Sequence, residues 1–154
     1  MHPFEHLHHA ARSDLGLVRG NNEDAFGGFP EAGVFCVADG MGGGDDGEFA
    51  SAETVAALSE FCGQLHAAPG CGHPAAVLSM GISAALNRAS ASIVRHTAEH
   101  GLKACGSTFV GVVFDATAPD TAIALHAGDS RLYRYRNGTL LRVTRDHSVA
   151  ELMG

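Results

Sequence analysis

Residues 34–38, Val-Phe-Cys-Val-Ala, form a short apolar run that is followed by Asp39 and Gly40. The run is rich in β-forming residues and is too short for a core helix, which predicts a buried strand. The glycine-rich stretch that follows, residues 40–47, is expected to be a loop. A strand of this kind requires a sheet around it, with Asp39 held rigidly where the strand ends.

The rest of the chain carries helical and strand patterns that do not alternate. Apolar residues recur every three or four positions from about Glu48 to Leu65, and again from Pro74 to about Glu99, which predicts two amphipathic helices. Asn137-Gly138 is a strong hairpin signal. Further strands are expected at residues 25–29, 107–114, 123–127, 132–136 and 140–144. Strands, two helices and then an antiparallel meander indicate an α+β fold with helices on one face of a sheet.

Length and composition narrow the class of protein. The 154 residues suit one domain or the larger part of one. With 17 acidic and 10 basic residues the formal charge is -7, which argues against binding to nucleic acid. No run approaches the ~18 apolar residues of a membrane span. The four cysteines form no C-x-x-C pair and no secretory signal is present, so reduced thiols in the cytoplasm are expected.

Asp39 is the first candidate for chemistry. A carboxylate followed by glycines, whose backbone carbonyls can approach a ligand closely, suits Mg²⁺ or Mn²⁺, because these cations prefer oxygen ligands. An equally good interpretation makes Asp39 a cap for the helix expected from Glu48. The calcium-binding EF-hand pattern is excluded, since the second and third ligand positions do not match.

Three other polar segments could contribute to a site. Arg19 precedes the adjacent acids Glu23 and Asp24, and an arginine offers planar recognition of phosphate. Asp129 lies in a tight turn, Gly-Asp-Ser-Arg, between two expected strands. Residues 144–148 read Thr-Arg-Asp-His-Ser, but adjacent residues on an extended chain point different ways, which argues against a catalytic triad. Taken singly, each segment is also typical of an exposed polar turn.

Together these segments resemble the metal-dependent, type 2C protein serine/threonine phosphatases in their bacterial form. Their order and spacing are more specific than any one of them. The resemblance extends from about residue 13 to the last residue, so residues 13–154 are expected to form the N-terminal portion of such a domain. Residues 1–12, which are rich in histidine, are expected to be a disordered tail. The matching segments begin at Ser13, Val37, Gly47, Gly106, Gly128 and Thr144.

The resemblance implies an antiparallel β-sandwich flanked by helices, with two Mg²⁺ or Mn²⁺ ions between the sheets. In that arrangement Asp39 bridges both metals and Gly40 offers its carbonyl. Glu23 and Asp24 belong to the metal shell, one or both through water. Asp129 matches an acidic residue that serves a third, more labile metal.

The reaction implied by the resemblance is hydrolysis of phosphoserine or phosphothreonine in protein substrates by a metal-activated water. Arg19 would hold the substrate phosphate, so Arg19 and Asp39 are the expected catalytic residues. The expected partners are phosphorylated proteins, including a serine/threonine kinase or its targets. Neither nucleic acid nor membrane is expected among them.

The sequence also departs from the family. Met41 stands where many members have a histidine proposed as the general acid. Asp45 and Asp46 are additional acids near the site. They could raise the affinity for metal or face solvent, and solvent exposure is the favoured expectation. The family carries two further metal-binding aspartates, one in a Ser-Asp-Gly-like motif and one in an Asp-Asn-like motif. Neither motif occurs after Asp129 in this sequence.

These departures predict a domain that is incomplete at its C-terminal side. The isolated chain is therefore expected to have little or no activity, and to associate with itself through an exposed sheet edge. The alternative is a non-catalytic, pseudophosphatase-like module that binds phosphoproteins or a partner through Arg19 without turnover.

Overall fold

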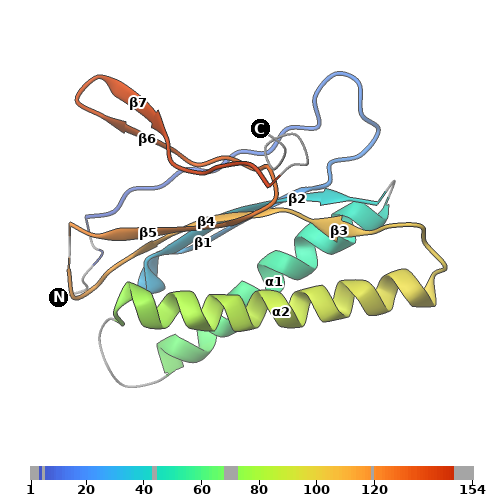
Figure 1. Cartoon of the computed structure of the whole chain (residues 1–154), viewed down its shortest axis with the longest axis horizontal. Coiled ribbons are helices and arrows are strands. Elements are labelled where there is room, and N and C mark those ends of the chain that lie inside the picture. Colours follow the sequence, from blue (N-terminus) through green and yellow to red (C-terminus); the bar gives the residue numbers. More distant parts are fainter. Residues whose placement is uncertain (1–3, 5, 43–44, 68–72, 119, 148–154) are drawn as a thin grey trace.

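The computed structural model places two long helices on one side of a five-stranded antiparallel sheet and a β-hairpin on the other side (Figure 1). This arrangement confirms the α+β class expected from the sequence. The described residues are 4, 6–42, 45–67, 73–118 and 120–147. In chain order the elements are β1 (Asp24–Phe29), the 3-10 helix η1 (Pro30–Ala32), β2 (Val34–Met41), α1 (Asp45–Ala67), α2 (Ala75–Glu99), β3 (Gly106–Ser107), β4 (Phe109–Phe114), β5 (Ala122–Ala127), β6 (Tyr133–Arg136) and β7 (Thr139–Arg142).

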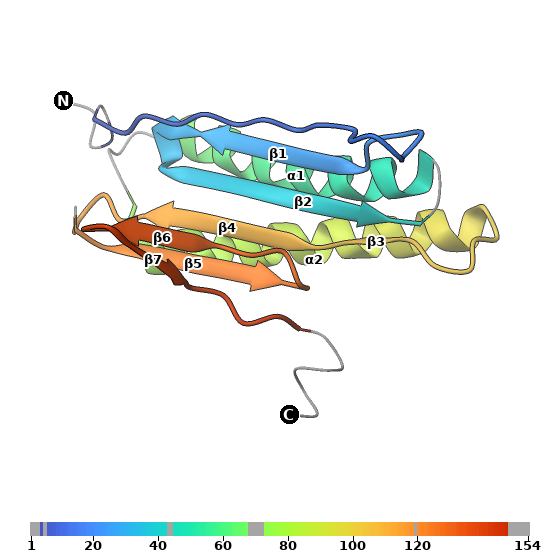
Figure 2. The ribbon, with the colours of Figure 1, turned by 90° about the horizontal axis from the view of Figure 1, so that it is seen from above.

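Strand β2 is central to the main sheet. The sheet order is β1-β2-β4-β5, and the short β3 pairs with the far end of β2 (Figure 2). The turn between β1 and β2 is η1, closed by Gly33 with φ +67, and it sets a register in which Phe29 pairs with Val34 and Asp24 pairs with Asp39. That register brings the two aspartates to one end of the sheet.

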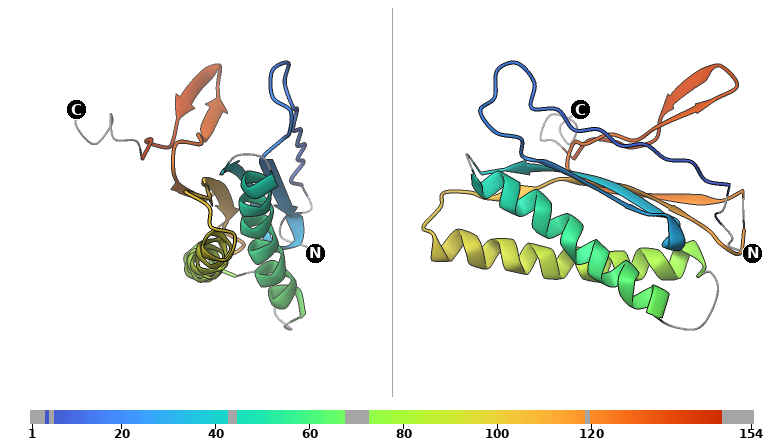
Figure 3. Two further views of the ribbon diagram at one scale, coloured as in Figure 1. Left: turned by 90° about the vertical axis from the view of Figure 1, so that its right-hand side faces the viewer. Right: turned by 180° about the vertical axis from the view of Figure 1, so that it is seen from behind.

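Alternation along β2 separates a core face from an open face. Val34, Cys36 and Ala38 are buried against the helices, whereas Val37 and Asp39 point to the opposite side. The two helices cross below the sheet and cover only its core face, as both views in Figure 3 show. The buried helix residues that complete the core are Leu58, Cys62, Ala75, Leu78, Ile82 and Ala85.

The two predicted helices are present, and one begins earlier than expected. Helix α2 starts after Pro74 and ends at the C-cap His100, followed by Gly101 with φ +64, in agreement with the sequence. Helix α1 begins at Asp45 rather than near Glu48. The acids of its first turn interact favourably with the positive end of the helix dipole, which explains the early start.

The prediction that the strand ends at Ala38 is wrong, and the loop predicted at residues 40–47 is wrong at residues 40–41 and 45–47. Residues 43–44 of that predicted loop lie outside the described residues. Strand β2 continues to Met41, because Gly40 and Met41 pair with Ser107 and Gly106 of β3. A partner distant in sequence therefore extends the strand, and a local pattern does not reveal such a partner. Asp39 consequently lies inside a strand, with neighbours on both sides.

The later strands follow the prediction with one interruption. The run at residues 107–114 is divided at Thr108, which separates β3 from β4. The hairpin of β6 and β7 turns at Asn137 and Gly138, whose φ values of 51 and 77 fit the predicted two-residue turn. This hairpin forms the second, two-stranded sheet.

Helix α2 is long and apolar enough to cross a membrane by length and composition alone. Its apolar stripe, which includes Leu78, Ile82 and Ala85, is buried in the core beneath the sheet. These contacts identify α2 as a core helix of the domain.

Candidate metal centre

Asp24 and Asp39 form the core of the candidate site. They are paired across β1 and β2, and residues that pair across antiparallel strands project to the same face. Both are exposed on the open face of the sheet. The alternative in which Asp39 caps a helix is excluded, because Asp39 lies inside β2 and α1 begins at Asp45.

The loop that precedes β1 surrounds this pair. It encloses a depression of about 250 Å³ beside the two carboxylates. Arg19 lies at its rim with 74% of its side chain exposed, and its Nη1 is 3.7 Å from Oε2 of Glu23. The residues around the depression are Asp14, Leu15, Arg19, Asn21, Asn22, Glu23, Asp24 and Asp39. The structure therefore brings together Arg19, Glu23, Asp24 and Asp39.

Other acidic side chains lie around Asp39. Burial raises the pKa of Asp39, and the nearby carboxylates of Asp24 and Asp129 raise it further, while Arg19 lowers it. Asp129 thus lies within electrostatic reach, although it belongs to the turn after β5. Acids that repel one another in this way are typical of a site that holds a cation.

Glu23 has different surroundings from Asp24. Its side chain is only 10% exposed and lies against the first turn of α1, since a Cβ added to Gly47 would be 2.6 Å from Cδ of Glu23. Asn21 donates a hydrogen bond of 3.4 Å to the same carboxylate. A contribution of Glu23 to the metal shell, directly or through water, stays a prediction.

Gly40 is fixed by close backbone packing. Its N–H donates to the carbonyl of Glu23 at 3.0 Å, and a Cβ at this position would lie 1.9 Å from the carbonyl oxygen of Gly47. Only glycine fits such an approach. The role of the Gly40 carbonyl as a ligand stays a prediction.

Thr108 and Ser130 lie beside the site, and the sequence did not predict them as site residues. Oγ1 of Thr108 accepts a hydrogen bond of 3.0 Å from the N–H of Asp39 and lies 2.6 Å from Oγ of Ser130. The only sequence signal for them was their place in the Gly-Ser-Thr and Gly-Asp-Ser-Arg segments. Hydrogen bonds between residues so far apart in the chain depend on the folded topology.

The prediction that Asp46 faces solvent is wrong, because its Oδ1 lies 3.0 Å from Nε2 of His96. The His96 ring stacks on Phe49 with ring centroids 4.0 Å apart. Its carbonyl accepts a hydrogen bond from Sγ of Cys105. Asp46 therefore ties the start of α1 to the end of α2, while Asp45 is exposed as predicted.

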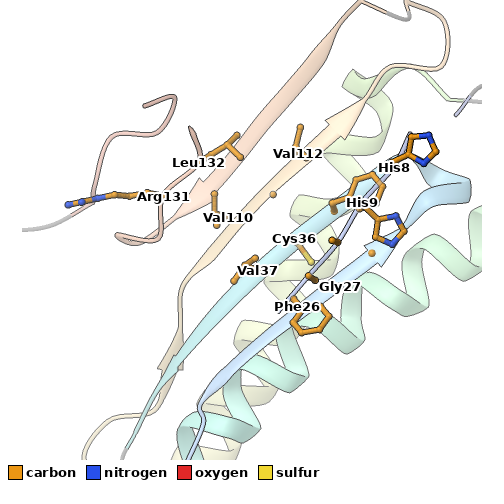
Figure 4. A pocket seen from close by; sticks show the side chains of 15 residues that line it. His8, His9, Phe26, Gly27, Cys36, Val37, Val110, Val112, Arg131 and Leu132 are labelled. Atoms are coloured by element: carbon orange, nitrogen blue, oxygen red, sulfur yellow. The ribbon is translucent and has the colours of Figure 1, made fainter. Parts of the chain in front are cut away.

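A larger pocket of about 760 Å³ lies on the same open face, between the sheet and the start of the hairpin (Figure 4). Its labelled lining includes Phe26, Val37 and Leu132, together with His9, whose ring centroid is 5.0 Å from that of Phe35. Among the residues that the structure describes, no Asp or Glu lines this pocket. The candidate chemistry therefore belongs to the smaller, acidic depression. That residues 1–12 form a disordered tail stays a prediction.

The carboxylates of the candidate site are the type of ligand that Mg²⁺ and Mn²⁺ prefer, but they supply only part of a coordination sphere. Asp24 and Asp39 offer hard carboxylate oxygens, and their mutual repulsion favours a cation. Within residues 6–42, 45–67, 73–118 and 120–147, no three His, Cys, Asp or Glu side chains converge closely enough to hold a metal ion.

Comparison with known sequences decides the family. A sequence model of the family described as protein phosphatase 2C matches residues 19–151. The chain belongs to the protein phosphatase 2C family. The match contains all of the predicted site residues, which are Arg19, Glu23, Asp24, Asp39, Gly40 and Asp129.

Two curated relatives are named serine/threonine phosphatases. The chain is 34% identical over 148 residues to the serine/threonine protein phosphatase PstP of Mycobacterium tuberculosis, covering 96% of this chain and 26% of that protein. It is 31% identical over 147 residues to the serine/threonine phosphatase stp of Listeria welshimeri, covering 93% of this chain and 56% of that protein. The chain therefore spans about half or less of the length of these relatives.

Solved phosphatase structures share the fold. PppA, a regulatory component of the type VI secretion system in Pseudomonas aeruginosa, superposes with a TM-score of 0.81 at 34% identity, over 94% of this chain and 58% of that one. The catalytic domain of PstP in complex with two manganese ions superposes with a TM-score of 0.74 at 35% identity, over 94% and 57% of the two chains.

Proposed function

We propose that this chain contributes the N-terminal part of a metal-dependent protein phosphatase that hydrolyses phosphoserine and phosphothreonine. The observation that carries the proposal is the pair Asp24 and Asp39, with Asp129 in electrostatic reach, beside Arg19 at one end of the sheet. The names of the relatives support an enzyme over a non-catalytic binding module.

Asp39 is proposed as the central metal ligand, with Asp24 beside it and Asp129 serving a more labile cation. The Gly40 carbonyl and Glu23 complete the proposed set, Glu23 directly or through water. A bound pair of Mg²⁺ or Mn²⁺ ions would supply Lewis acidity and lower the pKa of a water. The relative solved with two manganese ions supports this choice of metal.

Arg19 is proposed to bind the substrate phosphate. Its guanidinium is mostly exposed at the rim of the depression, and its contact with Glu23 at 3.7 Å is too long for a strong hydrogen bond. The group is therefore available for two parallel hydrogen bonds to phosphate oxygens. This contact orients the phosphorus toward the carboxylate end of the sheet and neutralises developing charge.

The proposed partners are phosphorylated proteins in the cytoplasm, among them a serine/threonine kinase or its targets. Self-association is proposed through the edge strand β5, whose outer side has no hydrogen-bonded strand in the described sheet.

Binding of a phosphopeptide tests the substrate class. With Mn²⁺ present, we expect the chain to bind a phosphothreonine peptide at least tenfold more tightly than its unphosphorylated form, measured by fluorescence anisotropy. Arg19→Ala should remove most of that difference. Arg95→Ala, which changes an exposed arginine of α2 on the other side of the sheet, should preserve it. Equal affinity for the two peptides would contradict the proposal.

Turnover tests the catalytic part. Among the described residues, no three acidic, histidine or cysteine side chains come together to hold a metal ion. We therefore expect the 154-residue chain to release phosphate slowly from the same peptide. Asp39→Asn should reduce that release to background. Slow release that is identical in both chains would leave no support for Asp39 as a catalytic residue. Rapid release by the wild-type chain would contradict the expectation of low activity.

A further inference from the structure

Thr108 holds the backbone of Asp39 at both ends of the residue. The N–H of Thr108 donates to the carbonyl of Asp39 at 2.8 Å, and the N–H of Asp39 donates to Oγ1 of Thr108 at 3.0 Å. Both backbone polar groups of Asp39 are therefore bonded to one residue that is 69 positions away in the chain. The use of Oγ1 as an acceptor also explains why the strand is interrupted at Thr108.

The same hydroxyl reaches a second acidic segment. Oγ1 of Thr108 lies 2.6 Å from Oγ of Ser130, which follows Asp129 directly. Its methyl group packs on Gly128, since a Cβ added to Gly128 would be 2.8 Å from Cγ2 of Thr108. Gly128 has φ +99, a conformation that other residues rarely adopt. Thr108 therefore contacts both segments that carry the proposed ligands.

We propose that Thr108 and Ser130 are positioning residues that set the separation of Asp39 and Asp129 and thereby the metal affinity of the centre. This inference rests on the proposed function. Neither hydroxyl needs to contact the metal or the substrate. Removing a group that orients a metal ligand typically lowers the metal affinity about 10–100-fold.

Three substitutions separate the hydroxyl from the bulk of the side chain. Thr108→Val keeps the shape but removes the acceptor for Asp39 and the partner of Ser130. Thr108→Ser restores the hydroxyl and lacks only the methyl group. Ser130→Ala removes the second bond alone. Thr54→Val is the matched control, because Thr54 is a buried threonine of α1 whose hydroxyl bonds only its own helix, at the carbonyl of Ala50.

The first measurement is the Kd for Mn²⁺, from electron paramagnetic resonance of free Mn²⁺. We expect Thr108→Val to raise the Kd about tenfold. Thr108→Ser and the control should stay within about twofold of wild type, and Ser130→Ala should lie between. The double variant Thr108→Val/Ser130→Ala should bind no more weakly than Thr108→Val, because both remove one shared bond.

The second measurement needs no metal. Amide hydrogen exchange at Asp39 should be slow in wild type and in Thr108→Ser, and at least tenfold faster in Thr108→Val, whose Asp39 N–H lacks its acceptor. A folded Thr108→Val with wild-type Mn²⁺ affinity and wild-type exchange would overturn the inference, as would weak binding by Thr108→Ser. If Asp39→Asn itself binds Mn²⁺ like wild type, the proposed metal centre fails instead.

Discussion

At the scale of single residues, the candidate centre depends on side chains that are small or absent. Gly40 lies against the backbone of Gly47, so the end of β2 can touch the first turn of α1. This contact keeps the carboxylate of Glu23 near the helix and that of Asp39 on the open face. Gly40 and Gly47 therefore set the distance between the end of β2 and the start of α1.

Gly40→Ala tests that contact. The added Cβ would lie 1.9 Å from the carbonyl oxygen of Gly47, so we expect a loss of about 3 kcal/mol of unfolding free energy. Urea unfolding followed by circular dichroism measures it. Gly63→Ala is the control, since Gly63 is exposed in α1 with no atom near its Cβ position, and it should gain about 0.5–1 kcal/mol. Equal stability of Gly40→Ala and wild type would show that the close approach is wrong.

The sequence predicted which acidic residues belong to the candidate site, but it predicted only part of how they are arranged in space. Asp39 followed by glycine suggested both a ligand and a cap, and the pairing with Asp24 across β1 resolved that choice. The bond between Asp46 and His96 joins residues fifty positions apart, and no local pattern encodes it. The hydroxyl pair of Thr108 and Ser130 escaped prediction for the same reason.

At the scale of elements, the hairpin of β6 and β7 is anchored to its flanks by one carboxylate. Asp146 accepts a hydrogen bond of 2.7 Å from Nη2 of Arg131 and another from Nη2 of Arg142, and its side chain is 11% exposed. The hydrogen bond from Arg131, with a smaller contribution from Arg142, holds the pKa of Asp146 below its usual range. Asp146 of the segment at residues 144–147 thus anchors the hairpin.

This anchor predicts a response to acid. A lowered pKa in the folded state means that the stabilisation is complete above the unfolded value of about 3.9 and is lost as the pH falls through the lower folded value. Amide NMR signals of β6 and β7 should therefore shift toward disordered values below about pH 4.

Asp146→Asn should loosen the hairpin at every pH and remove this transition. Asp120→Asn, at an exposed position before β5, serves as the control and should keep the transition. A hairpin whose signals are identical in Asp146→Asn and wild type at pH 6 would contradict the role of the anchor.

The type and order of the elements were largely predictable, and their ends were less so. Helix α2 and the Asn137-Gly138 hairpin carry strong local signals and were correct. Strand β2 was expected to stop at Ala38, but pairing with β3 extends it to Met41. Local patterns describe how a segment buries its side chains, and they do not describe which distant strand completes its hydrogen bonds.

At the scale of the whole molecule, the helices cover one face of the main sheet and leave the other partly open. Phe26 and Val37 on that open face are 47% and 46% exposed, and the sheet ends at the uncovered edge of β5. Exposed apolar surface next to an unpaired edge favours association between copies of a chain.

Sedimentation velocity tests self-association. We expect the sedimentation coefficient of the wild-type chain to rise with protein concentration. Ala122→Lys, which places a charge at the exposed start of β5, should reduce that rise, whereas Ala84→Lys on the exposed side of α2 should not. A monomer at all concentrations would rule out the proposed association.

Asp39 is proposed as the principal metal ligand of a protein phosphatase 2C centre. Isothermal calorimetry of Mn²⁺ binding measures this role, with Asp45→Asn as a matched loss of an exposed aspartate near the site. We expect Asp39→Asn to raise the Kd for Mn²⁺ at least tenfold, while Asp45→Asn stays within about twofold of wild type. The same Kd for all three chains would show that Asp39 is not a metal ligand.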